Sequence, residues 1–241
     1  MEISGANALV TGGGIRVGRG ITLALAAAGA NVFIHYGRSA DAAAATAEEA
    51  EKLGVRAGLG AADLSDPDNA ATLAELARET LGPLSILVNS ASGFPSDTLG
   101  DVTVAGLEST LRLSLLSPIM LTQAFAAQVT TKGVAVSVTD WRSHRPYPDH
   151  FSYTIAKGAL EVFTRAAAVA AAPAVRVNAV ALGAILPPPG KDAEYLKELA
   201  GKLPLKRIGS PELVGAAVAE LVRNDFVTGQ VLRLDGGASL V

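Results

Sequence analysis

Short apolar runs alternate with alanine-rich, helix-compatible stretches along the whole chain. Seven runs predict strands, at residues 7–11, 31–36, 55–59, 84–89, 133–138, 175–181 and 230–235. The stretches between them predict helices, at 16–28, 39–53, 66–81, two within 103–131, then 151–171, 194–201 and 211–223. The strand runs are nearly continuous Val, Ile, Leu and Ala, which is typical of parallel strands buried on both faces. The sequence therefore predicts an α/β fold, a doubly wound parallel sheet of about seven strands flanked by helices, in a single domain.

The composition excludes several classes of protein. Of the 241 residues, 49% are hydrophobic and 18% are charged, which predicts a folded chain with a sizeable core. The net charge of −3 comes from scattered acids and bases, so we expect no nucleic-acid partner. Because the chain has no cysteine, disulfides and thiolate metal sites are excluded, and we expect no metal. With no unbroken run of about 18 apolar residues and no secretory signal, we expect a cytoplasmic protein away from membranes.

A glycine-rich turn joins the first predicted strand to the first predicted helix. Residues 11–18 read Thr-Gly-Gly-Gly-Ile-Arg-Val-Gly. Glycines permit a tight turn and bring backbone N–H groups close to a pyrophosphate, and the start of the helix adds a favourable field for that anion. The turn therefore predicts a dinucleotide site that includes Gly12, Arg16, Val17 and Gly18. Arg16 could reach back over the phosphates; a solvated arginine at a helix start is the alternative.

The end of the second predicted strand indicates which dinucleotide binds. NAD sites commonly place an Asp or Glu there to accept hydrogen bonds from the ribose hydroxyls. This chain has no acid at that point and reads His35, Tyr36, Gly37, Arg38 and Ser39. Arg38 can make charge-assisted bonds to a 2′-phosphate, and Ser39 can donate one more. We therefore predict NADPH rather than NADH as the cofactor, with a plain surface arginine at 38 as the alternative.

Tyr153 and Lys157 carry the predicted acid chemistry. They are four residues apart on a predicted helix, so their side chains share one face. A phenol has a pKa near 10 and is a sluggish acid at neutral pH. We expect the Lys157 ammonium to favour the phenolate and to draw the pKa of Tyr153 down, so that Tyr153 gives a proton to a substrate during reduction.

These motifs together resemble the short-chain dehydrogenase/reductase family, whose members have a Rossmann fold. The family's glycine turn reads Thr-Gly-x-x-x-Gly-x-Gly, so Arg16 stands where a glycine is usual. The resemblance extends along the whole chain, including residues 204–212, 227–230 and 235–237. It implies that Tyr153 protonates the substrate as hydride arrives from the nicotinamide, and that Lys157 also bonds the nicotinamide ribose.

Further contacts are implied by the resemblance alone. Asp63 and Leu64 follow the third predicted strand, where the family's Asp usually meets the adenine amino group. Asn89, Ser90 and Ala91 close the fourth strand and would lie against the ribose on the nicotinamide side. After the sixth strand the usual Pro-Gly reads Leu182-Gly183, and residues 184–203 would form a mobile lid over the substrate.

Two positions depart from the family pattern. Asp140 stands where the family has a serine thirteen residues before the tyrosine, and Ser114 stands where an asparagine is usual. An ionised Asp140 cannot donate a hydrogen bond and would repel a developing alkoxide. A substrate that presents N–H groups or a C=N bond therefore fits better than a simple ketone, and Asp140 could orient Tyr153. A turn-capping Asp140 with weak or no activity is the alternative. Ser114 can still hold a relay water.

The departures themselves resemble those of pteridine reductases. The shared positions are Arg16, residues 35–39, Ser92-Gly93-Phe94 and Asp140 with Tyr153 and Lys157. In those enzymes the counterpart of Phe94 stacks the pterin ring against the nicotinamide, and the counterpart of Asp140 works with the tyrosine. The implied substrate contacts are Ser92, Phe94, Asp140 and Tyr153. Plain core packing of Phe94 is the alternative.

Three functions follow from this reading. The leading prediction is an NADPH-dependent reductase of a dihydropterin or dihydrofolate-like substrate. The first alternative is a carbonyl reductase for a 3-oxoacyl thioester, sugar or ketone, and the second is a non-catalytic NADPH-binding regulatory protein. Arg142, His144 and Arg145 could meet an anionic substrate tail, although a solvated loop is the better prediction for them. The resemblance also implies a homo-oligomer, a tetramer packed through the helices at 103–131 and 151–171.

Overall fold

A seven-stranded parallel sheet forms the centre of the molecule. The computed structural model describes residues 1–188 and 190–241. The strands lie in the order β3-β2-β1-β4-β5-β6-β7, and every neighbouring pair is parallel. Their bounds are β1 Asn7–Val10, β2 Asn31–Tyr36, β3 Ala57–Ala61, β4 Ile86–Asn89, β5 Gly133–Asp140, β6 Val175–Leu182 and β7 Val231–Leu234. The predicted doubly wound sheet is confirmed.

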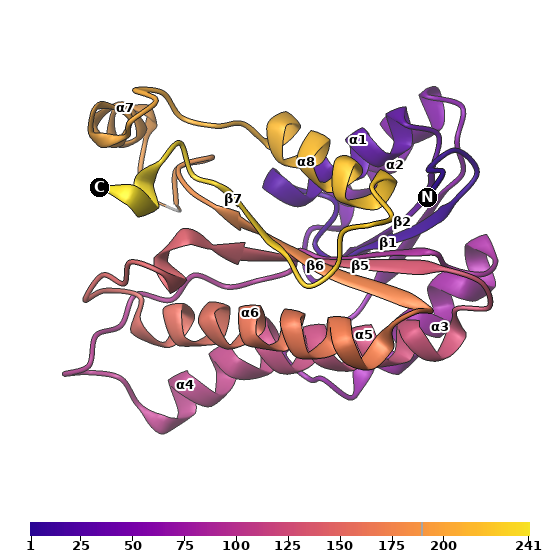
Figure 1. The fold of residues 1–241 in the computed structure, drawn as a ribbon, viewed down its shortest axis with the longest axis horizontal. Helices are drawn as coiled ribbons and strands as arrows, with labels where there is room; N and C mark the ends of the chain where they lie inside the picture. The colour runs from indigo at the N-terminus through magenta and orange to yellow at the C-terminus, as the bar shows by residue number, and fades with distance from the viewer. Residues whose placement is uncertain (189) are drawn as a thin grey trace.

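Helices cover both faces of this sheet (Figure 1). One face carries α1, α2 and α8, and the other carries α3, α4, α5 and α6. The bounds are α1 Arg16–Ala27, α2 Ala40–Lys52, α3 Asn69–Leu81, α4 Val104–Leu111, α5 Ser117–Gln128, α6 Phe151–Ala171, α7 Ala193–Lys202 and α8 Pro211–Arg223. A π-helical segment, η1 (Arg112–Leu116), joins α4 to α5 without a break in the chain's helical course. Two short 3₁₀ turns, η2 (Trp141–Ser143) and η3 (Ala238–Leu240), complete the elements.

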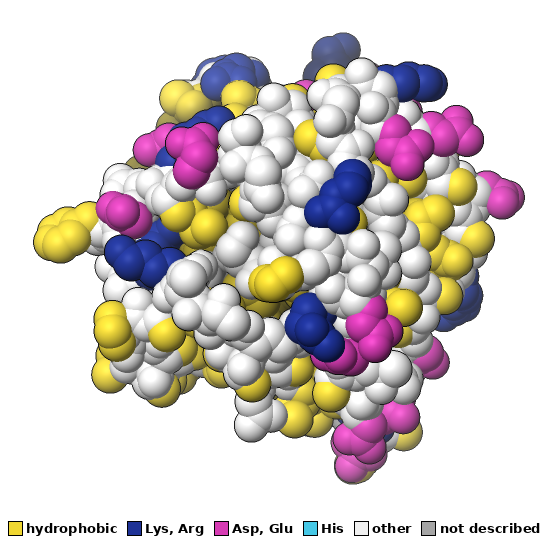
Figure 2. Space-filling view, turned by 90° about the vertical axis from the view of Figure 1, so that its right-hand side faces the viewer, with side chains coloured by type: hydrophobic (Ala, Val, Ile, Leu, Met, Phe, Trp, Pro, Cys, Tyr) yellow, Lys and Arg dark blue, Asp and Glu magenta, His cyan; other side chains and the backbone are white. Residues whose placement is uncertain are grey.

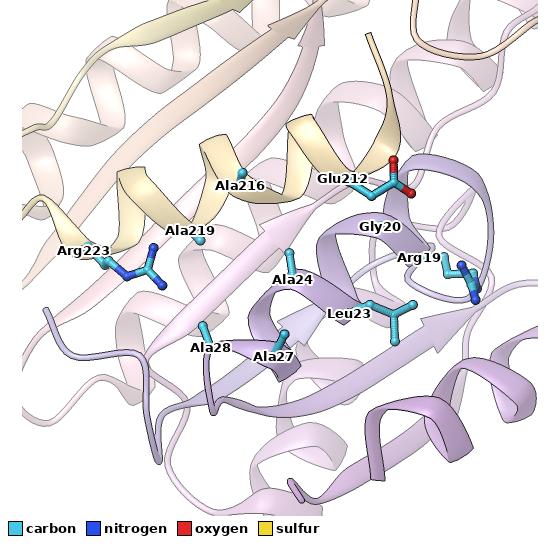
Figure 3. A pocket seen from close by; sticks show the side chains of 10 residues that line it. All are labelled: Arg19, Gly20, Leu23, Ala24, Ala27, Ala28, Glu212, Ala216, Ala219 and Arg223. Carbon is cyan, nitrogen blue, oxygen red and sulfur yellow. The ribbon is translucent and has the colours of Figure 1, made fainter. Parts of the chain in front are cut away.

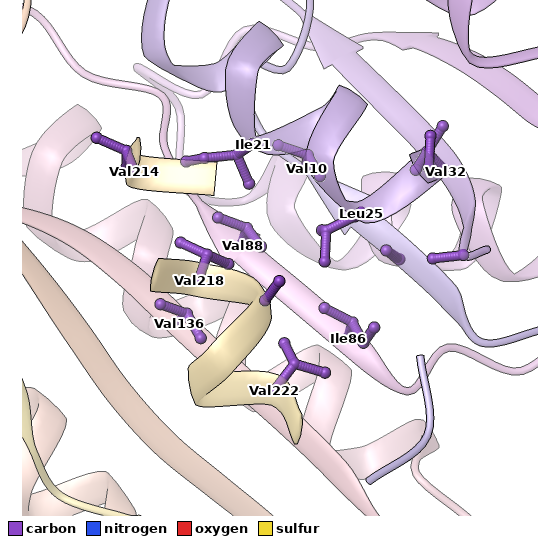
Figure 4. Packing of buried hydrophobic residues seen from close by; sticks show 14 of the residues in the cluster. Val10, Ile21, Leu25, Val32, Ile86, Val88, Val136, Val214, Val218 and Val222 are labelled. Atoms are coloured by element: carbon purple, nitrogen blue, oxygen red, sulfur yellow. The ribbon is translucent and has the colours of Figure 1, made fainter. Parts of the chain in front are cut away.

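The two faces of the sheet supply two separate cores because successive strand residues point to opposite sides. Val10, Val88 and Val136 pack against Ile21 of α1 and Val218 of α8 (Figure 4). Their neighbours face α3, α5 and α6 in the second cluster, which includes Leu9, Leu87, Ala135, Leu73 and Phe125. This explains why the central strand runs are apolar on both faces, with few polar residues.

Most element boundaries agree with the prediction, and two differences have clear causes. The third long helix starts at Asn69 instead of 66, and Asp68 is its N-cap residue. Pro67 disfavours helical backbone at Asp66, the residue before it, so residues 63–69 form turns first. The edge strands β3 and β7 are also partly exposed, so burial on both faces holds only for the central strands.

The surface bears scattered charge and one apolar helical stretch. On the face in Figure 2, acidic and basic side chains are interspersed among apolar ones. Val104–Gln128, which spans α4, η1 and α5, is long and apolar enough to cross a membrane by length and composition, with a mean hydropathy of 1.2. The sequence prediction did not recognise this stretch. It packs against α3 and α6, as the core helices of water-soluble proteins also do, so the membrane signal is weak.

Candidate active site

The carboxyl ends of the parallel strands bring the predicted site residues to one edge of the sheet. The glycine turn follows β1, His35 and Tyr36 end β2, Asn89 ends β4 and Asp140 ends β5. In the sheet register Asn89 lies opposite Ser137, and Asp140 lies opposite Leu182. Ligands of open α/β sheets bind at this edge. The topology therefore gathers residues that are more than a hundred positions apart in the sequence.

The glycine turn is held by close backbone packing. Gly12 has a φ of +61°, in the left-handed region that glycine adopts without strain. A Cβ on Gly18 would lie 2.0 Å from the Gly12 carbonyl oxygen. Position 18 in α1 therefore has room only for a glycine. Within the described residues, the α1 N-terminus has no side-chain cap and no acid in its first turn. Its N–H groups and its positive dipole end therefore suit a pyrophosphate.

Arg16 stands in the turn at a φ of +52°, a left-handed conformation that is strained for an arginine. Its Nη2 donates a 2.7 Å hydrogen bond to the carbonyl oxygen of Pro187, in the segment predicted to be a lid. The structure thus joins the glycine turn to that segment. A contact between Arg16 and the cofactor phosphates stays a prediction.

His35 has a different role from the one predicted. Its ring is 2% exposed, Nδ1 accepts from the Gly12 N–H at 3.1 Å, and Nε2 donates to the Ala62 carbonyl at 3.0 Å. Burial lowers the pKa of His35, which keeps the ring neutral and able to accept from Gly12. Both nitrogens are thereby engaged by the protein. His35 braces the glycine turn against β3 instead of offering its side chain to a cofactor.

The residues predicted to bind the adenosine end lie close together. Hydrogen bonds from Ser65 and, to a smaller extent, the charge of Arg38 lower the pKa of Asp63, so Arg38 lies near this carboxylate. Ser39 occupies the N-cap position of α2. Leu64 is buried in the core, and its carbonyl accepts from Ser117 at 2.6 Å. Leu64 therefore offers no side chain to a ligand, and contacts of Arg38, Ser39 and Asp63 with the cofactor stay predictions.

The β4 end is fixed by side chains from two neighbouring elements. The Thr11 hydroxyl accepts hydrogen bonds from the N–H groups of Ser90 and Ala91, at 2.9 and 3.0 Å. The amide of Asn89, which is 3% exposed, donates to Thr122 of α5 at 3.2 Å. The Asn89 side chain therefore anchors α5 under the sheet. A cofactor contact there falls to the backbone of Ser90 and Ala91, and it stays a prediction.

Asp140 and Tyr153 meet directly. The Tyr153 hydroxyl donates to Asp140 Oδ2 at 3.1 Å, and Asp140 Oδ1 accepts from the Arg142 N–H at 2.9 Å. Lys157, one turn further along α6, donates from Nζ to the Val138 carbonyl at 2.8 Å, and Nζ lies 5.5 Å from the centre of the Tyr153 ring. The structure thus brings together three of the four side chains that the sequence predicted to be catalytic, the fourth being Ser114.

The predicted effect of Lys157 on Tyr153 is wrong. Burial, followed by the charge and hydrogen bond of Asp140, raises the pKa of Tyr153 well above its ordinary value. Burial lowers the pKa of Lys157 to about 8 and raises the pKa of Asp140. The nearest ionisable partner of the phenol is an acid, and a second negative charge beside it is unfavourable. Tyr153 is therefore held as a neutral phenol that has a proton to give.

The ring of Phe94 lies beside Tyr153, and the hydroxyls of Ser92 and Ser114 form a further polar pair of predicted site residues. The Phe94 ring stacks on His150, with centroids 3.7 Å apart and an interplanar angle of 19°, and meets Tyr153 edge-on at 4.8 Å. The hydroxyls of Ser92 and Ser114 are 3.2 Å apart, and Ser114 lies buried in the π-helical segment η1. Phe94 therefore lines the site instead of the core, and His150 covers a ring face.

Comparisons with known proteins agree with this geometry. A family model described as enoyl-(acyl carrier protein) reductase matches residues 14–239. The fold also superposes on a short-chain dehydrogenase/reductase from Serratia marcescens, with a TM-score of 0.93, 28% identity and coverage of 99% of this chain and 100% of that one.

The chain belongs to the short-chain dehydrogenase/reductase family. FolM alternative dihydrofolate reductase 1 from Brucella suis, solved in complex with NADP, is 34% identical to this reductase, with a TM-score of 0.95 over 100% of this chain and 97% of that one. A Streptomyces violaceoruber protein named "Granaticin polyketide synthase putative ketoacyl reductase 2" is 34% identical, and the match covers 97% of this chain and 96% of that protein.

The loop at 141–150 of this reductase is exposed over residues 144–148, as the sequence favoured for His144 and Arg145, but Arg142 is partly buried. Arg142 forms an ion pair with Asp149 at 3.3 Å, and its guanidinium lies 4.9 Å from the ring centre of Tyr147. His150, which sequence reasoning missed, sits at a φ of +52° as the N-cap residue of α6. Its position directly before the Tyr153 helix was the available signal. Arg142 is thus held by the loop and is not free to reach for a substrate tail.

The segment after β6 packs against the end of β7. The Gly183 N–H donates to the Leu234 carbonyl at 2.9 Å, and a Cβ on Gly183 would lie 2.5 Å from the Asp235 Cα. Close packing on the β7 end therefore requires glycine at 183. The predicted lid at 184–203 contains α7, with Leu196 largely buried, and Pro189 lies outside the described residues. Its mobility stays a prediction.

Proposed function

We propose that this reductase transfers hydride from NADPH to a pteridine-type substrate, dihydropterin or dihydrofolate-like, with Tyr153 as the proton donor. The observation that carries the proposal is the 3.1 Å hydrogen bond from Tyr153 to Asp140, at the position where the family usually has a serine. Phe94 lies edge-on to the same tyrosine.

The cofactor is NADPH, as the sequence predicted, because similar structures of this family, such as that from Brucella suis, hold NADP. The residues of this chain fit it. The uncapped start of α1 suits the pyrophosphate, Arg38 offers a cation for the 2′-phosphate, and the Lys157 ammonium suits ribose hydroxyls. NADPH supplies the hydride, and the chain's own residues handle the proton.

Proton transfer is assigned to Tyr153. Its raised pKa keeps it protonated until a basic atom of the substrate takes the proton. Asp140 orients the phenol through its Oδ2, and the turn that follows β5 orients Asp140 through the Arg142 N–H. Because burial raises the pKa of Asp140, this carboxyl takes up a proton more readily than a free one and can return it to Tyr153 during turnover.

The proposed substrate class follows from the Asp140 carboxylate, which accepts hydrogen bonds, and from the aromatic ring of Phe94. A carboxylate accepts hydrogen bonds and cannot donate them, so Asp140 favours substrates with N–H groups over a plain ketone oxygen. Phe94 offers an aromatic surface beside Tyr153, which suits a flat heteroaromatic ring once His150 gives access to it. The similarity to a protein named alternative dihydrofolate reductase supports the same substrate class.

A carbonyl reductase is the second candidate. It is supported by the 34% identity to the Streptomyces violaceoruber protein whose name includes ketoacyl reductase. Tyr153 and Lys157 would serve a carbonyl as well as a C=N bond. Against this candidate stands Asp140, which replaces the hydroxyl that would donate to a carbonyl oxygen.

The test compares substrates under one cofactor. NADPH oxidation is followed by absorbance with dihydrobiopterin or dihydrofolate, and in parallel with an acetoacetyl thioester and a simple diketone. Turnover of the pterins alone supports the proposal, and turnover of the carbonyls alone overturns it. Asp140→Ser sharpens the result, because the pterin assignment expects it to lose pterin turnover and to gain turnover of ketones.

A homotetramer in the cytoplasm completes the proposal. Apolar side chains remain exposed on α4, α5 and α6, among them Val104, Met120, Ile155, Val162 and Val169. Exposed apolar area of this kind favours association with a second copy. Light scattering of the purified chain tests it, and a monomer at micromolar concentration would contradict it.

A further inference from the structure

Glu161 is a buried acid that the reaction scheme above does not use. It lies on α6, eight residues after Tyr153 and four after Lys157, so the three side chains share one face of the helix. Its residue exposure is 3%. Carboxylates are almost never buried without partners, so its contacts indicate its role.

The Glu161 carboxylate joins α6 to the turn that carries Asp140. Oε1 contacts the hydroxyls of Thr139, at 3.3 Å, and of Ser143. Oε2 lies 3.1 Å from Nε2 of His144. Thr139 directly precedes Asp140 in β5, and Ser143 and His144 follow it in and after η2. One carboxylate thus holds residues on both sides of Asp140.

The same turn sets the conformation of Asp140. The Ser143 hydroxyl lies 2.7 Å from the Asp140 carbonyl oxygen, and the Arg142 N–H holds Asp140 Oδ1. A hydroxyl has one proton, so Ser143 can donate to only one of its two acceptors at a time, and an ionised carboxylate is the stronger acceptor. The charge of Glu161 therefore decides how Ser143 is oriented under Asp140.

The far side of the cluster reaches the edge strand β7. Arg233 Nη2 lies 3.0 Å and 3.1 Å from the two nitrogens of His144. His144 is the titratable side chain that contacts Glu161 from the loop, and Arg233 of β7 contacts His144 in turn. His144 thus holds Oε2, which leaves Oε1 for Ser143 and Thr139.

We propose that Glu161 is a positioning residue of this reductase, which holds the Asp140 turn against α6 and so sets the contact between Asp140 and Tyr153. The proposal rests on the function proposed above, since it gives Asp140 a part in the reaction. Displacement of a reacting group by about 1 Å can cost about 100-fold in rate. For Glu161→Gln, which keeps the shape and removes the charge, we expect kcat to fall about 10-fold.

The experiment separates positioning from stability with three readouts. In Glu161→Gln we expect a lower kcat, an unchanged Kd for NADPH by fluorescence, and faster amide hydrogen exchange confined to residues 140–144 of the cofactor-free protein. In an Asp140→Asn background the same change should have almost no further effect on kcat, because there is no carboxylate left to position. Thr164→Val is the matched control, since Thr164 is a buried polar residue of α6 that bonds only its own helix.

Three results would contradict the positioning role of Glu161. Equal losses of kcat in the wild-type and Asp140→Asn backgrounds, an unchanged kcat, or faster exchange along all of α6 would overturn the proposal. If Glu161→Gln does not fold, Ser143→Ala removes the same link, and an unchanged kcat in that variant overturns it. If only carbonyl compounds are turned over, the pterin assignment fails and the comparison is repeated with them. If no substrate is turned over, the exchange pattern decides alone.

Discussion

The glycine turn after β1 and the β5–α6 junction lie at the same edge of the sheet. They differ in what holds them: backbone packing in the turn, and buried ionisable side chains in the junction. The turn relies on backbone and on missing side chains: Gly12 at a positive φ, and Gly18 in contact with the Gly12 carbonyl. The junction relies on buried ionisable side chains, Asp140, Tyr153 and Lys157, whose pKa values are shifted mainly by burial and to a smaller extent by the contacts of Asp140 with the other two.

This difference indicates that the glycine turn serves cofactor binding and that the β5–α6 junction serves proton transfer. Close backbone packing at the turn depends little on pH, and the start of α1 beside it has no side-chain cap, which suits an anion. Buried charges at the junction respond to pH and to the loss of any one partner, because low-dielectric surroundings strengthen their interactions. Binding at the first region and turnover at the second should therefore respond to separate substitutions.

The largest expected effect is at Tyr153. Because Tyr153→Phe removes the hydroxyl that supplies the proton, we expect kcat to fall by about 100- to 10,000-fold. The Kd for NADPH, measured by fluorescence titration, should stay within about twofold, since the glycine turn is untouched. If Tyr153→Phe keeps its turnover, another group donates the proton, and the proposed division between a binding region and a reacting region is wrong.

The next effect is steric and belongs to the turn. Gly18→Ala places a Cβ 2.0 Å from the Gly12 carbonyl oxygen, and we expect a loss of about 3 kcal/mol in the free energy of unfolding together with weaker NADPH binding. The matched control is Gly158→Ala in α6, where a Cβ has its nearest contact at 3.9 Å. That variant should gain about 1 kcal/mol, because alanine is the better helix former. Urea unfolding measures both, and equal changes would contradict the packing argument.

A smaller effect concerns the choice of cofactor. Arg38→Ser removes the cation predicted to meet the 2′-phosphate, and hydrogen bonds to charged groups contribute about 2 kcal/mol. We expect the Kd for NADPH to rise about 30-fold while the Kd for NADH stays nearly unchanged. Titration of both cofactors, with Arg38→Lys as the charge-preserving control, checks this. Parallel losses for NADPH and NADH would place Arg38 outside the phosphate site.

The smallest effect is the pH dependence of Lys157. Its folded pKa of about 8 lies below the unfolded value of 10.5, so between these values the unfolded chain binds the extra proton. Lys157 therefore lowers stability below pH 8, and this penalty is relieved by about 1 kcal/mol per pH unit as the pH rises above 8. Urea unfolding of the wild type and of Lys157→Met measures this effect. The difference in their free energies of unfolding should change as the pH rises above 8. kcat/KM, which reports free-enzyme groups, should fall above about pH 8.

Several features of the site could be predicted because they depend on local sequence. The exact bounds of β2, α6 and α8 followed from apolar periodicity, and the glycine turn followed from composition between a strand and a helix. The pairing of Asp140 with Tyr153 was expected from a resemblance. By contrast, the direction of the Tyr153 pKa was predicted wrongly, because spacing on α6 revealed Lys157 but not that Asp140 is the closer ionisable partner.

The sequence by itself determined the parallel sheet, its two apolar faces and the gathering of the site at the carboxyl ends of the strands. Each of these depends on patterns of neighbouring residues and on the rule that βαβ connections keep strands parallel. Tertiary structure alone decided that His35 braces the glycine turn, that His150 stacks on Phe94 and that Glu161 holds the Asp140 turn. These roles depend on burial and on partners distant in the sequence, and desolvation is a property of the folded surroundings, not of the residue.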